Sequence, residues 1–290
     1  MSVLVIGADG LVGAAIVRLL KASGRCVQGT TRRISQRDFR FLDLASDAVE
    51  DFALADVETA IVCAAVNGFA RCRADPEAAY DVNVKATEIL ARRLAAQGGR
   101  LIYLSSSAVF DFRRPQMPAE APHSPTSVYG KHKALAEDRV LAAHPSNTVV
   151  RLTKVLAPNT SHFGSWLIAL HLNATVRAYS DLHFCPIALD YAANAIIKIM
   201  ENGGGIYQVS GASDVSYAAA AGYLAKRIGR DESRVIAERA ISDGIPLEEI
   251  ARFTSLDASR FAALTGYNAP DPFEVMNTVF DPFIRQLQRA

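Results

Sequence analysis

The sequence predicts an α/β fold in which helices cover both faces of a doubly wound parallel sheet. Short apolar runs alternate with longer amphipathic stretches through the first 155 residues, which is the pattern of repeated β-α-β units. A glycine-rich turn directly follows the first apolar run, at the point where such a fold makes its first crossover. The chain has 290 residues, 50% of them apolar, so it can form one large domain or two coupled ones.

The expected strands are short apolar runs, at residues 3–6, 26–29, 59–63, 100–104 and 148–152, with a weaker one near 39–41. The expected helices have apolar positions near helical spacing, at residues 11–22, 76–96 and 127–143. Residues 113–125 contain several prolines, so we expect a loop there. Beyond residue 155 the alternation loosens, and we expect helices at 190–200 and 215–228 and a strand at 206–209.

The composition excludes several classes of function. Because 31 Lys and Arg balance 30 Asp and Glu, a strongly basic nucleic-acid binder or a polybasic membrane reader is not expected. No apolar run approaches the roughly 18 residues that cross a bilayer, and the N-terminus has no signal-peptide pattern. The four cysteines form no CxxC pair and the histidines show no metal-ligand spacing. We therefore expect a reducing, cytoplasmic setting, free thiols and no metal.

The turn between the first strand and the first helix reads Gly7-Ala8-Asp9-Gly10-Leu11-Val12-Gly13. Glycines in this position let the backbone approach a pyrophosphate, and the helix start supplies free N–H donors and positive dipole charge. We therefore expect Gly7, Gly10, Leu11, Val12 and Gly13 to bind a dinucleotide, within a Rossmann-type domain at residues 1–155. Residues 156–290 are expected to form mainly a smaller substrate-binding subdomain, with residues 186–210 returning to the first sheet.

The end of the second strand indicates which dinucleotide binds. An acidic residue there would favour NAD, but this chain has Thr30-Thr31-Arg32-Arg33. Two guanidinium groups suit a 2′-phosphate, so we expect Arg32 and Arg33 to favour NADP(H), with NAD(H) as the alternative. A solvated basic turn with no ligand is the simpler interpretation of these arginines. Asp43 and Leu44, after the weak third strand, are placed to meet the adenine.

A candidate catalytic pair lies on the helix expected at 127–143. Tyr129 and Lys133 are four residues apart, which places both side chains on one helical face. An ammonium beside a phenol favours the phenolate, so we expect Lys133 to lower the pKa of Tyr129 and to contact the nicotinamide ribose. Ser105-Ser106-Ser107 follows the strand at 100–104, at the edge where open α/β sheets bind ligands.

These motifs together resemble the extended short-chain dehydrogenase/reductase family, in particular its dTDP-4-dehydrorhamnose reductase-like branch. The resemblance is dense through residue 155 and thin afterwards. The family's alanine pair after the fourth strand is Ala64-Ala65 here, which implies contact with the nicotinamide side. Counting back from Val109 along the branch's Ser-Thr-Asp-Tyr-Val-Phe-Asp run assigns the catalytic hydroxyl to Ser106.

The resemblance implies hydride transfer from NADPH to a keto carbon of a nucleotide-linked sugar. Ser106 would orient the carbonyl, Tyr129 would donate the proton, and Lys133 would support the tyrosine. Ser107 and Ala108 replace the branch's Asp-Tyr, and they also supply no acid for a dehydratase. A nucleotide-sugar epimerase with the same Ser, Tyr and Lys remains an alternative. A non-catalytic NADP-binding sensor or regulatory subunit is a second alternative.

The second half of the chain is expected to supply the substrate pocket. Besides Ser106 and Ser107, the candidates are Lys154, His162 and Trp166, because a diphosphate attracts cations and a base stacks on an aromatic ring. A lone Trp is more often core packing. The apolar faces of the helices at 76–96 and 127–143 are expected either to pair with a second subunit as a homodimer or simply to cover the sheet. Asn83, near the start of the first of these helices, is either a helix cap or a support for the site.

Overall fold

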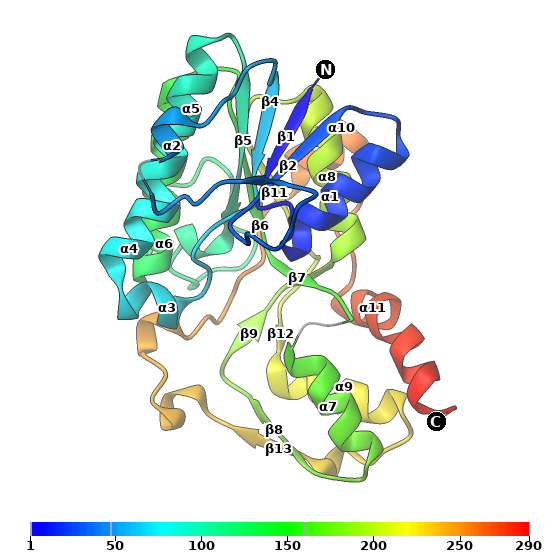
Figure 1. Cartoon of the computed structure of the whole chain (residues 1–290). Coiled ribbons are helices and arrows are strands. Elements are labelled where there is room, and N and C mark those ends of the chain that lie inside the picture. The colour runs from blue at the N-terminus through cyan, green and yellow to red at the C-terminus, as the bar shows by residue number, and fades with distance from the viewer. Residues whose placement is uncertain (1, 47, 159–160, 290) are drawn as a thin grey trace.

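The computed structural model describes residues 2–46, 48–158 and 161–289, which form two lobes (Figure 1). The upper lobe in this view holds a seven-stranded sheet in which every neighbouring pair is parallel, in the order β11-β6-β5-β4-β1-β2-β3. Its strands are β1 (Val3–Ile6), β2 (Val27–Thr31), β3 (Arg40–Phe41), β4 (Thr59–Val62), β5 (Arg100–Ser106), β6 (Thr148–Leu152) and β11 (Gly205–Val209). The strand order reverses direction beside β1, where sheets of this kind bind ligands. The predicted α/β doubly wound class is confirmed.

Helices cover both faces of this sheet because alternate strand residues point to opposite sides. Val3 and Val5 of β1 belong to a core with α1 (Leu11–Ala22), α8 (Leu189–Asn202) and α10 (Ser259–Thr265). Leu4 and Ile6 belong to the opposite core, which packs against three other helices: α2 (Ala48–Asp51), α5 (Ala86–Ala96) and α6 (Val128–Ala143). Leu90 and Leu94 of α5 and Ala136 and Val140 of α6 belong to this second core, so these faces of the two helices cover the sheet.

The helix predicted at 76–96 is wrong in its detail. It consists of α4 (Pro76–Tyr80), a π-helical turn at Asp81–Lys85, and α5. Asp75 caps α4, its side chain accepting from the Ala78 N–H at 3.0 Å. A further helix that the sequence did not predict, α3 (Phe69–Ala74), precedes it. Single π turns often occur at functional sites, because the extra residue displaces a side chain from the regular helical face.

The lower lobe has its own core, around Phe163, Leu224 and Phe280. Its helices are α7 (Ser161–His171), α9 (Tyr217–Arg227) and α11 (Pro272–Leu287). Three two-stranded sheets join it: β7 (Lys154–Leu156) with β10 (Pro186–Ala188), β9 (His183–Phe184) with β12 (Val215–Ser216), and β8 (Val176–Tyr179) with β13 (Val235–Glu238). The helix predicted at 215–228 thus starts two residues late, because Val215 and Ser216 pair with β9.

Single-turn 3-10 segments lie in the connections, at Ser107–Val109, Glu232–Arg234, Ala240–Asp243 and Leu247–Glu249. The last two belong to a segment that leaves the lower lobe and passes beneath α3 (Figure 1). Among the helices of the described residues, none is both long and apolar enough to cross a bilayer.

Candidate active site

The glycine turn between β1 and α1 is tightly folded. Gly7 has φ +83°, and a Cβ there would lie 2.9 Å from the Ala64 Cβ. A Cβ on Gly13 would lie 2.2 Å from the Gly7 carbonyl oxygen, so only glycine fits where α1 meets the turn. Gly10 at the N-cap of α1 makes no side-chain cap hydrogen bond, so the N–H groups of the first turn, from Leu11 onward, lack that acceptor. This turn therefore has the geometry of an anion cradle.

The two arginines after β2 have different surroundings. Arg33 is held by the turn itself, its Nε lying 3.2 Å from the Asp9 carboxylate, which also accepts from the Thr31 hydroxyl at 2.7 Å. Arg32 is exposed and has no hydrogen-bond or ion-pair partner among the residues that the structure describes. Arg32 is therefore the guanidinium available to a ligand, whereas Arg33 ties β2 to the glycine turn.

Asp43 and Leu44 follow β3, as predicted, but each already makes a contact within the protein. Asp43 Oδ1 accepts from the Ala45 N–H at 3.0 Å, and Leu44 is buried in the core beneath the sheet. Ala64 and Ala65 follow β4 after Cys63, and the Ala64 N–H donates to the Ile6 carbonyl at 3.0 Å. This bond holds the alanine pair beside the glycine turn.

Ser106, Tyr129 and Lys133 come together at the carboxyl edge of the sheet. Ser106 is the last residue of β5 and forms a hydrogen bond with Tyr129. Tyr129 stands in the first turn of α6, which Ser127 caps by accepting from the Gly130 N–H at 3.1 Å. Lys133 is buried one turn further along, and its ammonium donates to the Leu104 carbonyl at 2.8 Å. Both β5 and the α6 cap therefore determine this geometry.

The pKa of Tyr129 is raised rather than lowered, and Lys133 is not among the groups that shift it. Burial raises the pKa of Tyr129 to about 12, and the hydrogen bond with Ser106 opposes this only in part. Lys133 Nζ lies 5.8 Å from the centre of the Tyr129 ring and bonds elsewhere. Burial in turn lowers the pKa of Lys133 to about 8, against the attraction of Glu137, Cys72 and Cys63. The phenol therefore keeps its proton at neutral pH, whereas Lys133 titrates near physiological pH.

We expect Lys133→Met to be more stable than wild type at pH 7. The buried ammonium has lost its hydration, and a methionine side chain of similar length carries no charge that needs hydration. After subtracting the lost hydrogen bond to the Leu104 carbonyl, the free energy of unfolding should increase by about 1–3 kcal/mol. The pKa of Lys133 is lower in the folded chain (about 8) than its ordinary 10.5, so the unfolded chain binds more protons between these values. Wild-type stability therefore rises with pH there and the advantage of the variant shrinks. Urea unfolding at pH 7 and 9.5 measures this; an equal advantage at both would contradict it.

A cavity of about 1070 Å³ opens onto these residues and is lined by both lobes. Ser106, Ser107, Tyr129, Lys133 and Lys154 line it, as does Val12 from the glycine turn. The cavity therefore joins Ser106, Tyr129 and Lys133 to the glycine turn, and Lys154 is the one residue among the three substrate contacts predicted in the second half that lines it.

Two predicted substrate contacts do not line this cavity. Trp166 packs edge-on against Phe163, with ring centroids 5.4 Å apart, in the core of the lower lobe. His162 lies on α7 with its side chain largely open to solvent, and the loss of part of its hydration, with the charge of Lys154, lowers its pKa. The simpler interpretation of Trp166 as core packing is the one that the structure favours.

Other residues around the cavity were missed from the sequence. Phe69, Arg71 and Arg73 come from α3, Tyr217 from the start of α9, and residues 243–246 from the segment beneath α3. The sequence position of α3 could have indicated its role, because it follows the carboxyl end of β4. Residues that follow the carboxyl ends of strands in an open α/β sheet are candidates for the ligand site. The residues of the second lobe carried no such signal.

Asn83 is not a helix cap. It is buried in the π-helical turn, where its Oδ1 accepts from the Val66 N–H at 2.8 Å and its Nδ2 donates to the Val66 carbonyl at 3.1 Å. Asn83 thereby fixes the loop that follows β4 and carries Ala64 and Ala65. It supports the site through the backbone rather than by facing the cavity.

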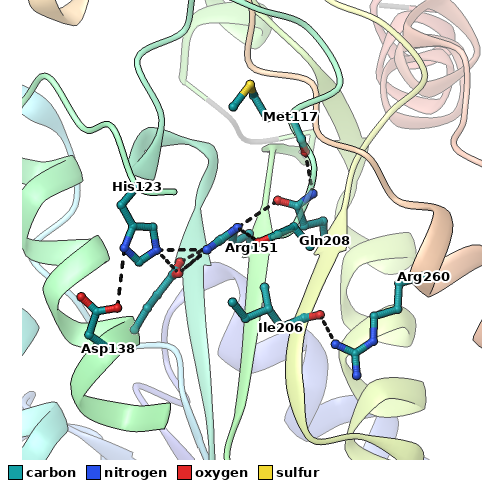
Figure 2. A network of polar contacts seen from close by, with 9 residues as sticks. Met117, His123, Asp138, Arg151, Ile206, Gln208 and Arg260 are labelled. Atoms are coloured by element: carbon teal, nitrogen blue, oxygen red, sulfur yellow. Dashed lines mark hydrogen bonds and ion pairs between the residues drawn. The ribbon is translucent and has the colours of Figure 1, made fainter. Parts of the chain in front are cut away.

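Behind Lys133, the same face of α6 carries Glu137, which is fully buried against Arg151 of β6. Arg151 Nη2 lies 2.7 Å and Nε 3.0 Å from the two Glu137 oxygens, and His123 Nε2 lies 2.8 Å from Oε2. Figure 2 shows Arg151 between His123 and Gln208. Burial alone would raise the pKa of Glu137, but the hydrogen bonds from His123 and Arg151 and the charge of Arg151 hold it below its usual range.

The family model described as the RmlD substrate binding domain matches residues 1–280 of this chain. The chain belongs to that family. This membership confirms the resemblance that the motifs indicated. The rat methionine adenosyltransferase 2 subunit beta is 32% identical over 152 residues, which is 52% of this chain and 46% of the relative. The chain thus matches less than half the length of that relative.

Other relatives of the RmlD-family chain are named as reductases. A dTDP-4-dehydrorhamnose reductase of Sinorhizobium fredii is 28% identical over 194 residues, covering 63% of this chain and 66% of the relative. A dTDP-4-dehydrorhamnose reductase of Bacillus anthracis, solved in complex with NADP, superposes with a TM-score of 0.84 at 18% identity, covering 97% and 99% of the two chains. At this identity the structural likeness establishes a shared fold.

Proposed function

We propose that this RmlD-family protein is an NADPH-dependent reductase of a nucleotide-linked keto-sugar. The observation that carries the proposal is the convergence of Ser106, Tyr129 and Lys133 on one cavity that Val12 of the glycine turn also lines. The relatives named dTDP-4-dehydrorhamnose reductase support the same class of substrate. In this proposal residues 1–155 hold the cofactor and residues 156–290 mainly complete the substrate pocket.

The glycine turn fits a dinucleotide, because its close packing leaves no Cβ between the backbone and a bound pyrophosphate. Gly7, Gly10 and Gly13 with the N–H groups of Leu11 and Val12 would hold the pyrophosphate, and Arg32 the 2′-phosphate. Ala64, Ala65 and Lys133 would border the nicotinamide ribose. When bound, NADPH supplies the hydride for reduction.

The chain's own residues handle the carbonyl and the proton. The Ser106 hydroxyl, at the end of β5, orients the substrate carbonyl. Because burial raises its pKa to about 12, Tyr129 is fully protonated at neutral pH and acts as a proton donor to the developing alkoxide. The Lys133 ammonium provides a positive charge near the phenol. Because the pKa of Lys133 is about 8, this charge is lost as the pH rises past that value.

We expect Arg32→Ala to weaken NADPH binding by about 10-fold or more, because a charged hydrogen-bonding pair is removed. NADH has no 2′-phosphate, so its affinity should stay within about twofold. Fluorescence titration of both cofactors measures the difference. Arg33→Ala is the matched control, and since Arg33 is tied to Asp9 it should affect both cofactors alike. An equal loss for both cofactors in Arg32→Ala would contradict this assignment.

The test of the proposed function is NADPH oxidation with a panel of nucleotide 4-keto-sugars, including dTDP-4-dehydrorhamnose. We expect stoichiometric oxidation with at least one member and reduction of its keto group by mass spectrometry. Conversion of a nucleotide sugar into its epimer with no net oxidation would instead support the epimerase alternative. In both reactions Ser106→Ala should lose most of the rate.

A non-catalytic subunit is the second candidate, favoured by the relatives named as subunit beta of methionine adenosyltransferase 2. Such a protein would bind NADP without turning over any keto-sugar in the panel. The presence of Ser106, Tyr129 and Lys133 around a shared cavity favours the reductase, since a binding subunit needs no proton donor.

A further inference from the structure

We propose that the sugar of the substrate carries a carboxylate, and that Arg71 of α3 recognises it. This inference rests on the proposed function and concerns the same cavity. The inference depends on three features of the cavity lining: the position of α3, the difference between its two arginines, and the position of Lys154.

Helix α3 lies beside the proposed proton donor. Its first residue, Phe69, packs edge-on against Tyr129 with ring centroids 5.8 Å apart and against Phe112 at 6.2 Å. Two residues later, Arg71 also lines the cavity. A ligand group that reaches α3 therefore belongs to the part of the substrate near the reacting carbonyl, which is the sugar.

The two arginines of α3 differ in their partners. Arg73 forms an ion pair with Glu249, whose side chain is buried, so its charge is compensated. Arg71 is exposed to the cavity, and within residues 2–46, 48–158 and 161–289 its guanidinium has no hydrogen-bond or ion-pair partner. The packing of Phe69 and the ion pair of Arg73 hold α3 on either side of Arg71.

The other substrate-facing cation stands on another wall. Lys154 begins β7, and its Nζ lies 5.8 Å from the centre of the Tyr217 ring, which also lines the cavity. Figure 1 shows β7 between the two lobes, whereas α3 lies at the outer edge of the upper lobe beneath α4. Because a diphosphate is compact, it cannot contact two cations on separate walls of the cavity. We therefore assign Lys154 to the diphosphate of the nucleotide, and Arg71 to a second anionic group on the substrate.

The other lining residues near α3 do not prevent an anion from binding at Arg71. Ser107 and Ala108 are uncharged, and the Glu249 carboxylate is bound to Arg73. Asp243, which also lines the cavity, accepts from the Tyr179 hydroxyl at 2.9 Å. A guanidinium binds a carboxylate with two parallel hydrogen bonds, so a uronic acid is the sugar that Arg71 fits best.

The experiment uses calorimetric titration of the full chain with NADP⁺ present. The ligands are UDP-glucuronic acid and UDP-glucose, which differ only in having a carboxylate or a hydroxymethyl group at C6 of the sugar, together with the two corresponding dTDP sugars. We expect wild type to bind the glucuronate about 10-fold or more tightly than the glucoside, and Arg71→Ala to remove this preference without changing the glucoside. Lys154→Ala, the matched control, should weaken both by the same factor.

The outcomes separate the two proposals. Equal binding of both sugars by wild type, or equal weakening of both by Arg71→Ala, overturns the assignment of Arg71 and leaves the reductase intact. Binding of none of the four sugars alongside NADP⁺ overturns the nucleotide-sugar function itself and the carboxylate with it. Thermal unfolding of Arg71→Ala should match wild type, because the side chain has no partner among the described residues.

Discussion

Tyr129→Phe should reduce NADPH-dependent turnover of the keto-sugar by about 10²–10⁴-fold, the usual contribution of a positioned proton donor. The phenol is the group whose proton is retained at neutral pH, since burial raises its pKa to about 12. Phe keeps the ring that packs against Phe69, so the shape of the cavity should be preserved. Cofactor affinity should stay within about twofold, because the glycine turn is untouched.

The measurement is the initial rate of NADPH oxidation with a saturating keto-sugar, paired with a fluorescence titration of NADPH. Tyr103→Phe is the matched control: Tyr103 is buried in β5, and its hydroxyl has no hydrogen-bond partner in the described part of the chain. That variant should keep the wild-type rate. A Tyr129→Phe enzyme with undiminished turnover would remove Tyr129 from the mechanism.

Glu137→Ala should destabilise the fold by about 3–5 kcal/mol, because it leaves the Arg151 guanidinium buried without its counter-charge. Arg151 is 1% exposed and makes its shortest contact, 2.7 Å, with Glu137. The partners that remain are the Ala119 carbonyl at 2.9 Å, the Gln208 amide oxygen at 3.3 Å and His123 Nε2 at 3.0 Å, and none of them carries a negative charge. This pair lies behind Lys133 on α6, so its loss should also loosen the site.

Urea unfolding of Glu137→Ala at pH 7 tests this expectation. The double variant Glu137→Leu with Arg151→Met provides the control, since it removes both charges and keeps apolar volume in their place. It should recover most of the lost stability, because a buried ion pair is costly mainly when broken on one side. A single variant that loses less than about 1 kcal/mol would show that water or His123 compensates Arg151.

Much of the upper lobe could be predicted because its signals are local. The strand patterns, the spacing of Tyr129 and Lys133 and the glycine turn each depend on residues within one turn or one crossover. The short helix α3 and the π-helical turn around Asn83 were missed. Their geometry depends on the Phe69 ring contacts and on the Asn83 bonds to the Val66 backbone, which periodicity does not reveal.

The candidate site was predicted less completely than the fold. Helix spacing predicted Tyr129 and Lys133, a strand end predicted the Ser105–Ser107 run, and the family resemblance selected Ser106 from it; Ser106, Tyr129 and Lys133 all line the cavity. Trp166 is a pocket candidate on residue type alone, and the core packing that is more usual for a lone Trp is what the structure has. Arg71 escaped notice because nothing in its neighbourhood distinguishes it from a solvated surface arginine.

The order of the main strands and helices of the upper lobe, the glycine turn and the helical face shared by Tyr129 and Lys133 all follow from the sequence alone. Which arginines are free depends on the three-dimensional packing, because Arg33 pairs with Asp9 and Arg73 pairs with Glu249, which lies far along the chain. The packing also reversed the expected pKa shift of Tyr129. Desolvation depends on everything packed around a group, whereas helical spacing reports only its neighbours on the same helix.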